Sequence, residues 1–168
     1  MWIRSPAEYD QLMKPIPARC LILACGNTLR EDDGVGPWLA KWAEKQFASD
    51  GCVRVLSRQQ WTPELAEDVA HAEAVIFIDC AANVEAGSLH LAPVSPGSET
   101  AGIATHHFGA AELLSLAKEM FGAVPRVSVL LTIGAGSLSL REGFSEAVKA
   151  ALPQACRVLE VSVRQFLT

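Results

Sequence analysis

Unbroken apolar runs recur along the chain and predict β-strands buried on both faces. The clearest covers residues 20–24 and is followed closely by Gly26. Runs of the same character lie at 53–56, 74–78 and 127–133. A shorter and more polar run at 89–93 is expected at an edge of the sheet.

Apolar residues at helical spacing separate these runs. After the first run they fall on one helix face, at positions 35, 38, 39, 42, 43 and 47. Thr62 followed by Pro63 is a typical helix start. Further helices are predicted at 108–121 and 147–166, the last kinked or restarted at Pro153. This alternation predicts an α/β fold: a three-layer α/β/α sandwich with a mainly parallel, twisted five-stranded sheet.

The first residues do not share the regular alternation. Residues 1–18 contain Pro6, Pro15 and Pro17, and we expect them to form an N-terminal extension whose truncation is tolerated. Residues 19–168 are predicted to form one α/β domain, because a chain of 168 residues fits a single domain.

Composition and charge narrow the class of protein. Hydrophobic residues make up 50% of the chain and charged residues 20%, which excludes disorder. A net charge of −5 argues against a nucleic-acid partner. We expect no membrane helix and no signal peptide, because no apolar run is long enough, and therefore predict a cytoplasmic protein. The five scattered cysteines form no C-x-x-C pair and are expected to be buried free thiols.

Carboxylates follow two of the predicted strands, where ligands of parallel α/β sheets bind. Glu31, Asp32 and Asp33 lie in the loop between the first strand and its helix. Acids at a helix start commonly cap the helix, and this interpretation is favoured for Asp32. The flanking glycines favour a functional role for Asp33, because a loop with little bulk lets another backbone approach. Asp79 directly follows the third run and needs a partner, such as a charge, a metal or local amides.

Histidines are candidates for a third group at this site. His106 and His107 open the helix predicted at 108–121, and adjacent helical residues point about 100° apart, so at most one faces a given site. His71 and His90 are expected on the surface. One imidazole with Asp33 and Asp79 would form a three-ligand site for a borderline divalent metal.

Other catalytic motifs do not fit the sequence. The loop after the first strand lacks G-x-G-x-x-G, and its acids would repel phosphates. The sequence contains no G-x-S-x-G elbow and no Walker loop. A nucleophilic Cys25 is disfavoured, because acidic neighbours raise the pKa of a thiol.

The candidate residues occur in a fixed order along the chain. A first motif reads Gly26-Asn27-x-Leu29-x-x-Asp32-Asp33-Gly34-Val35-Gly36. Asp79 and then a Thr-His pair at 105–106 follow it. In this order the chain, from about Cys20 onward, resembles the maturation endopeptidases of nickel-iron hydrogenases. It departs from their pattern at Ala24, where glycine is usual, and at 57–60, where Ser-Arg-Gln-Gln replaces Asp-Gly-Gly-Thr.

The resemblance implies a metal-dependent, nickel-recognising endopeptidase that removes the C-terminal extension of a nickel-loaded hydrogenase large-subunit precursor. It implies Asp33, Asp79 and His106 as the residues of catalysis and metal contact. The nickel is expected to come with the substrate, and other divalent metals can occupy the site in vitro. Residues expected to position the substrate are Gly26, Asn27, Asp32 and His107. Two alternatives stay open: a non-catalytic chaperone or checkpoint for the same precursor, and a small-molecule metallohydrolase.

Overall fold

A five-stranded sheet forms the middle of the molecule, in the order β2-β1-β3-β5-β4. The computed structural model describes residues 18–98 and 108–168, so the proposed extension lies almost wholly outside the described residues and stays a prediction. The strands are β1 (Cys20–Cys25), β2 (Val53–Arg58), β3 (Ala74–Ala81), β4 (Leu89–Pro93) and β5 (Val127–Gly134). All pairings are parallel except that of β4 with β5. The mainly parallel sheet and the edge position of β4 are therefore confirmed.

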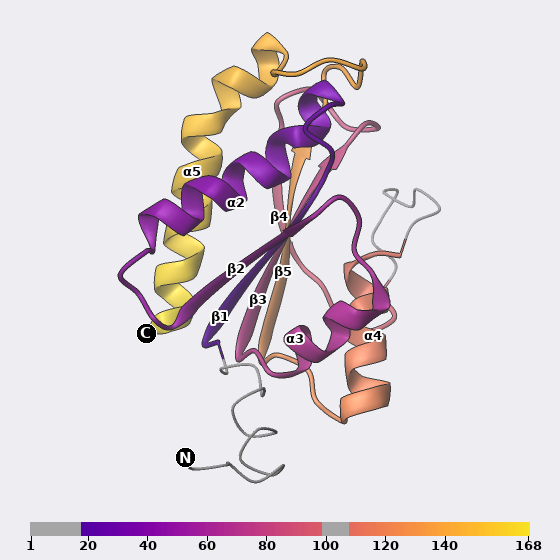
Figure 1. Ribbon diagram of the computed structural model, residues 1–168, viewed down its shortest axis with the longest axis vertical. Helices are drawn as coiled ribbons and strands as arrows, with labels where there is room; N and C mark the ends of the chain where they lie inside the picture. The colour runs from indigo at the N-terminus through magenta and orange to yellow at the C-terminus, as the bar shows by residue number, and fades with distance from the viewer. Residues whose placement is uncertain (1–17, 99–107) are drawn as a thin grey trace, which may run out of the picture.

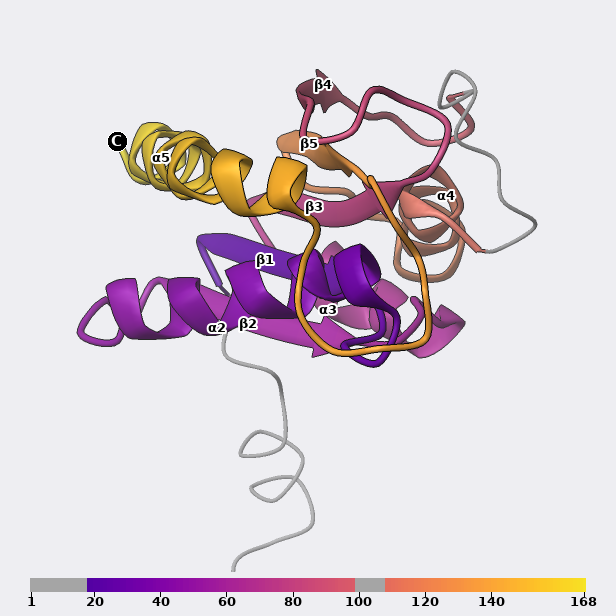
Figure 2. The same cartoon turned by 90° about the horizontal axis from the view of Figure 1, so that it is seen from above.

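Helices cover both faces of the sheet (Figure 1). One face carries α2 (Val35–Gln46) and α5 (Glu146–Leu167), and the other carries α3 (Ala66–Ala70) and α4 (Ala110–Phe121). The short 3-10 turns η1 (Glu31–Gly34) and η2 (Pro63–Leu65) precede α2 and α3. The view from above separates the three layers and confirms the predicted sandwich (Figure 2). No helix in the described ranges is long and apolar enough to span a bilayer.

Each central strand supplies two hydrophobic cores. In β1, Ile22 packs in the core beneath α2 and α5, whereas Leu21 and Leu23 pack in the core beneath α3 and α4. All three side chains are at least 99% buried. Because successive side chains alternate between the two covered faces, the strand has no polar face, and its sequence is continuously apolar.

Three element boundaries differ from the prediction. Helix α4 begins at Ala110, with Gly109 as its N-cap, two residues later than the predicted start at 108. His106 and His107, which were expected to open this helix, lie outside the described residues. Strand β3 continues to Ala81, because its pairing with β5 extends past the apolar run, so Asp79 lies within the strand.

The C-terminal helix α5 runs as one helix through Pro153, so the restart that the prediction allowed there is wrong, while the alternative, a kink at Pro153, stays a prediction. Pro153 has no N–H to donate to the carbonyl of Lys149 four residues earlier. Because Lys149 is exposed, a water molecule can donate to this carbonyl instead. The predicted surface positions of His71 and His90 are confirmed.

Candidate active site

Two glycines let the loop that carries Asp33 lie tightly against the end of β1. Gly26 has φ +144°, and a Cβ placed there would lie 1.9 Å from the carbonyl oxygen of Asp33. A Cβ at Gly36 would lie 2.2 Å from the carbonyl oxygen of Cys25. The loop was predicted to admit another backbone, and the backbone that approaches these glycines is the chain's own.

The carboxylate of Asp33 is held by the turn before it. Its Oδ2 accepts a hydrogen bond from the backbone N–H of Asn27 at 2.9 Å. The side-chain Oδ1 of Asn27 accepts the N–H of Leu29 at 2.9 Å, which orders the same turn. The contacts of Asn27 thus orient Asp33, which is half-buried and retains accessible surface.

Asp79 reaches the same end of the sheet from β3. Its Oδ1 accepts hydrogen bonds from the N–H of Cys80 at 2.8 Å and from the Sγ–H of Cys25 at 3.2 Å. The turn η1 packs against β3, so the loop carrying Asp33 and the strand carrying Asp79 are neighbours. The two carboxylates therefore share one edge, as the strand-end rule predicts.

The surroundings of this edge are acidic, and the thiols there are protonated. Burial, followed by the charges of Asp33 and Asp79, raises the pKa of Cys80 to about 12. Burial and then the charge and hydrogen bond of Asp79 raise the pKa of Cys25 still further above its ordinary range. A thiol in this state is a hydrogen-bond donor and not a nucleophile, which confirms that Cys25 is unsuited to attack a carbonyl.

Two carboxylate oxygen donors suit a hard or borderline divalent metal. Among residues 18–98 and 108–168, no group of three or more His, Cys, Asp and Glu side chains is arranged to hold a metal ion. The expected third ligand, His106, and its neighbour His107 lie outside these ranges. The predicted three-ligand set stays a prediction.

Asp32 is fully buried and holds a distant loop, the 136–145 segment. Its Oδ2 accepts the N–H groups of Gly136 and Ser137 at 2.8 and 2.9 Å and the hydroxyl of Ser145 at 2.7 Å. Its Oδ1 accepts the N–H of Ser145 at 2.7 Å. The prediction that Asp32 caps its own helix was wrong, because the 136–145 segment supplies all these donors. With 0% exposure, this carboxylate has no surface for direct contact with a substrate.

Opposing effects set the pKa of Asp32. Burial is the largest single influence and raises the pKa, but the hydrogen bonds from Ser145, Ser137 and Gly136 together lower it below its ordinary value. Asp32 is therefore a buried anion stabilised by donors from another part of the chain.

Glu31 fixes the same segment at a second point. Its Oε1 accepts hydrogen bonds from both Nε and Nη2 of Arg141, and its N–H donates to the Arg141 carbonyl at 2.8 Å. Arg141 is also the main cause of the lowered pKa of Glu31. The second oxygen, Oε2, is buried and has no hydrogen-bond partner among the described residues.

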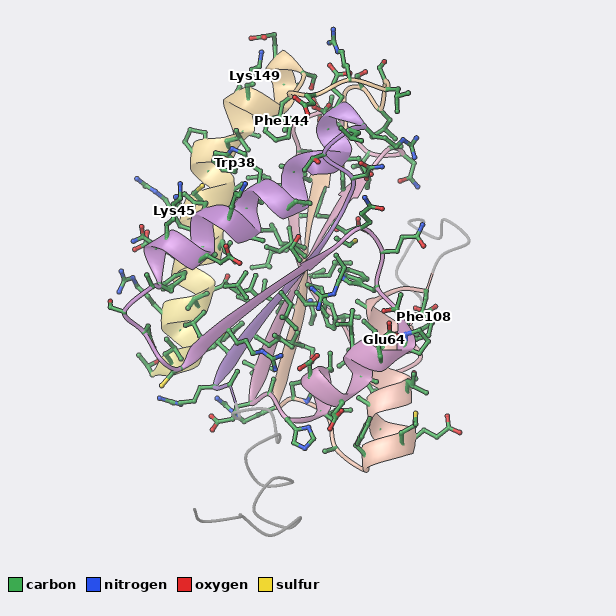
Figure 3. All side chains as sticks on the ribbon, viewed as in Figure 1. Trp38, Lys45, Glu64, Phe108, Phe144 and Lys149 are labelled. Atoms are coloured by element: carbon green, nitrogen blue, oxygen red, sulfur yellow. The ribbon has the colours of Figure 1, made fainter. Side chains whose placement is uncertain are left out.

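A groove of about 470 Å³ lies between the start of α2 and the 136–145 segment. We call it the Trp38–Phe144 groove, after two rings that pack edge to face with centroids 6.4 Å apart (Figure 3). Its lining includes Thr28, Gly34 and Ser57, at the carboxyl edge of the sheet. Helical spacing grouped Trp38 with the apolar face of its helix, but its side chain is 38% exposed and packs edge to face with Phe144.

The sequence reasoning missed Arg141 and Ser145, which tie the segment to η1. Ser145 carried a readable signal, since a serine before a helical pattern is a typical N-cap, and its hydroxyl accepts the N–H of Val148 at 3.4 Å. Nothing local to Arg141 indicates a partner in the first loop of the domain.

Solved structures of hydrogenase maturation endopeptidases share this fold. HybD from Escherichia coli matches with a TM-score of 0.71 and 23% identity, over 88% of this chain and 93% of its own. HybD from Thermococcus kodakarensis, a NiFe hydrogenase maturation protease, matches with a TM-score of 0.66 and 26% identity, over 84% of this chain and 97% of its own. HycI from the same organism matches with a TM-score of 0.65 and 25% identity, over 90% of this chain and 94% of its own.

No protein-family model and no curated protein sequence matches the chain. The resemblance to hydrogenase maturation endopeptidases is confirmed by strong structural similarity over most of the chain.

Proposed function

We propose that this chain is an endopeptidase of hydrogenase maturation, which removes the C-terminal extension of a nickel-loaded hydrogenase large-subunit precursor. One observation supports the proposal: η1, which carries Asp33, packs against β3, which carries Asp79, in a fold that this chain shares with HybD and HycI. Gly34, which directly follows Asp33, lines the Trp38–Phe144 groove.

The metal in this proposal arrives with the substrate. Asp33, Asp79 and His106 would contact nickel held by the precursor, and other divalent metals can occupy the same position in vitro. Oxygen-rich sites bind such metals less tightly than thiolate sites, which favours recognition over permanent retention. When bound, the metal supplies Lewis-acid chemistry at the scissile carbonyl or at an attacking water.

The residues around the carboxylates have a supporting role in this chemistry. The N–H of Asn27 holds Asp33, and the N–H of Cys80 and the thiol of Cys25 hold Asp79. Such partners fix the direction of the remaining oxygen lone pairs before a metal arrives. Gly26, in close contact with the backbone of Asp33, fixes the same loop.

We also propose that the protein acts in the cytoplasm. All five cysteines are free thiols, which suits a reducing compartment. The partner would be the precursor polypeptide and not a nucleic acid, in keeping with the net charge of −5.

The test is cleavage of a purified large-subunit precursor, in nickel-loaded and metal-free forms, followed by intact mass. We expect a discrete C-terminal loss in the nickel-loaded sample, abolished by Asp33→Asn and retained by Glu119→Gln, an exposed carboxylate on α4. Equal cleavage of both forms would remove nickel recognition from the proposal. Binding of the precursor without any mass change would favour a non-catalytic chaperone.

A further inference from the structure

We propose that Glu31 is a positioning residue for Asp33, held by Arg141 in a strained backbone conformation that sets the direction in which Asp33 leaves η1. The inference rests on the proposed function and adds to it a role for the 136–145 segment, which orients the candidate catalytic carboxylate. In this role neither Glu31 nor Arg141 touches the substrate.

The backbone of Glu31 lies in a region that residues with a Cβ seldom adopt. Its φ is +45°, and among residues 18–98 and 108–168 no other residue apart from glycine has a positive φ. The left-handed conformation is sterically unfavourable for a glutamate, so it persists only where surrounding contacts enforce it. Such residues cluster at functional sites, and Glu31 lies two positions before Asp33.

Arg141 supplies contacts that enforce this conformation. Its Nε and Nη2 both donate to Oε1 of Glu31, the first at 2.9 Å, and its carbonyl accepts the N–H of Glu31 at 2.8 Å. The Glu31 side chain is 1% exposed, whereas the Arg141 side chain is 69% exposed. If the pair breaks, water can solvate the guanidinium in place, but the buried carboxylate reaches water only when its backbone moves. Loss of the pair therefore acts on the position of Glu31.

Two hydrogen bonds of Asp33 depend on this position. The N–H of Asp33 donates to the carbonyl of Arg30 at 3.1 Å. Oδ2 of Asp33 accepts the N–H of Asn27 at 2.9 Å. Arg30 and Asn27 precede Glu31 in the chain and Asp33 follows it, so both bonds span the φ angle of Glu31. A change in this angle would move Asp33 away from both partners, and its carboxylate would lose the orientation that faces the metal.

The experiment measures steady-state cleavage of the nickel-loaded precursor. Arg141→Gln leaves the buried carboxylate of Glu31 without its cation. We expect kcat to fall about tenfold with KM within about threefold, the scale of losing a partner that orients a metal-contacting group. Urea unfolding of each variant confirms that the assayed protein is folded, since a pair that only stabilises the fold would leave kcat unchanged.

The matched control is Arg164→Gln on α5. Arg164 also donates from Nε and Nη2 to one carboxylate oxygen, Oε1 of Glu160, and its side chain is 65% exposed. The Glu160 carboxylate, however, is 33% exposed, so water can replace the guanidinium without a backbone change. We expect this control to leave both kcat and KM unchanged.

Substitutions of Glu31 test the strained conformation directly. Glycine adopts a positive φ without steric cost and carries no buried charge, whereas alanine retains the steric cost. We therefore expect Glu31→Gly to keep kcat within about threefold of wild type and Glu31→Ala to lower it about tenfold. Arg141→Gln should have no further effect in the Glu31→Gly background. A tenfold loss of kcat in that double variant would overturn the role of Glu31.

A second readout does not depend on cleavage. The amide of Asn27 donates to Asp33, so its hydrogen exchange reports the position of this carboxylate. We expect exchange at Asn27 to be about tenfold faster in Arg141→Gln and unchanged in Arg164→Gln. The double variant with Glu31→Gly should return to the wild-type rate.

The outcomes distinguish this inference from the proposed function. A wild type that cleaves no precursor would refute the peptidase, while exchange at Asn27 would still test the position of Asp33. If Arg141→Gln changes neither kcat nor exchange at Asn27, the inference is overturned and the peptidase stays intact. A raised KM with unchanged kcat would assign Arg141 to substrate binding and would also overturn the inference.

Discussion

Replacement of Asp32 tests whether this residue is structural, although it lies next to the candidate catalytic Asp33. Asp32→Ala removes the acceptor of four hydrogen bonds from Gly136, Ser137 and Ser145. Asp32→Asn keeps one oxygen, but its NH₂ group must face donors on the other side. Both variants should release the 136–145 segment from η1.

The magnitude follows from the exposure of the donors. A hydrogen bond to a charged group contributes about 1.5–3 kcal/mol net, but water can replace the acceptor for the exposed Gly136 and partly for the half-buried serines. We therefore expect Asp32→Ala to lower the free energy of unfolding by roughly 3–4 kcal/mol, at the upper end for single substitutions. For a domain of this size that corresponds to a fall in Tm of about 10 °C. Asp32→Asn should lose roughly 2 kcal/mol.

The assay is urea unfolding, with Asp33→Asn as the matched control. The control keeps an amide oxygen for the single bond from Asn27, so its loss should be below about 1 kcal/mol. Hydrogen exchange should show faster amide exchange at Ser137 and Ser145 in the Asp32 variants. A loss below about 1 kcal/mol for Asp32→Ala would refute the reasoning. It would mean that the free-energy cost of desolvating the buried carboxylate cancels the stabilisation from its hydrogen bonds.

The same contacts predict a pH dependence. Because the folded state lowers the pKa of Asp32, its ionised form stabilises the fold fully above the unfolded pKa of about 3.9. That stability is lost as the pH falls from there through the folded pKa. The stability difference between wild type and Asp32→Asn should therefore be constant from neutral pH down to about pH 5 and shrink below about pH 4. A difference that grows on acidification would contradict the assignment.

Two further substitutions test the close contacts around the carboxylates. Gly26→Ala places a Cβ 1.9 Å from the carbonyl oxygen of Asp33 at a residue with φ +144°. We therefore expect it to lower the free energy of unfolding by more than about 3 kcal/mol in the urea assay. The control is Gly51→Ala, which should be tolerated because a Cβ at Gly51 meets nothing within 4 Å. Cys25→Ser keeps a hydrogen-bond donor to Asp79 and should retain the cleavage rate within about threefold. Cys25→Ala removes the donor and should lower kcat about tenfold with little change in KM. Equal activity of the two variants would refute a role for the thiol hydrogen bond.

The sequence was sufficient for the fold and for part of the site. Alternating buried runs and amphipathic helices dictate a parallel sheet, and parallel strands bring Asp33 and Asp79 to one edge. The partners of Asp32 lie 104 to 113 positions away, so no local pattern could reveal them. Trp38 shows the same limit, because helical spacing grouped it with the apolar face of its helix, whereas its side chain is 38% exposed and packs against Phe144 from a distant segment.

The run Glu31-Asp32-Asp33 makes three separate contacts from one short turn. Glu31 has φ +45°, outside the 3-10 region, and Asp32 and Asp33 follow it in the turn, so the three side chains leave in different directions. Glu31 accordingly meets Arg141, Asp32 meets the 136–145 segment, and Asp33 meets the N–H of Asn27 at the candidate site. The turn thus connects the wall of the groove to the candidate catalytic carboxylate. For this reason the three acids should not be interchangeable, with Asp32 governing stability, Glu31 the position of Asp33, and Asp33 cleavage.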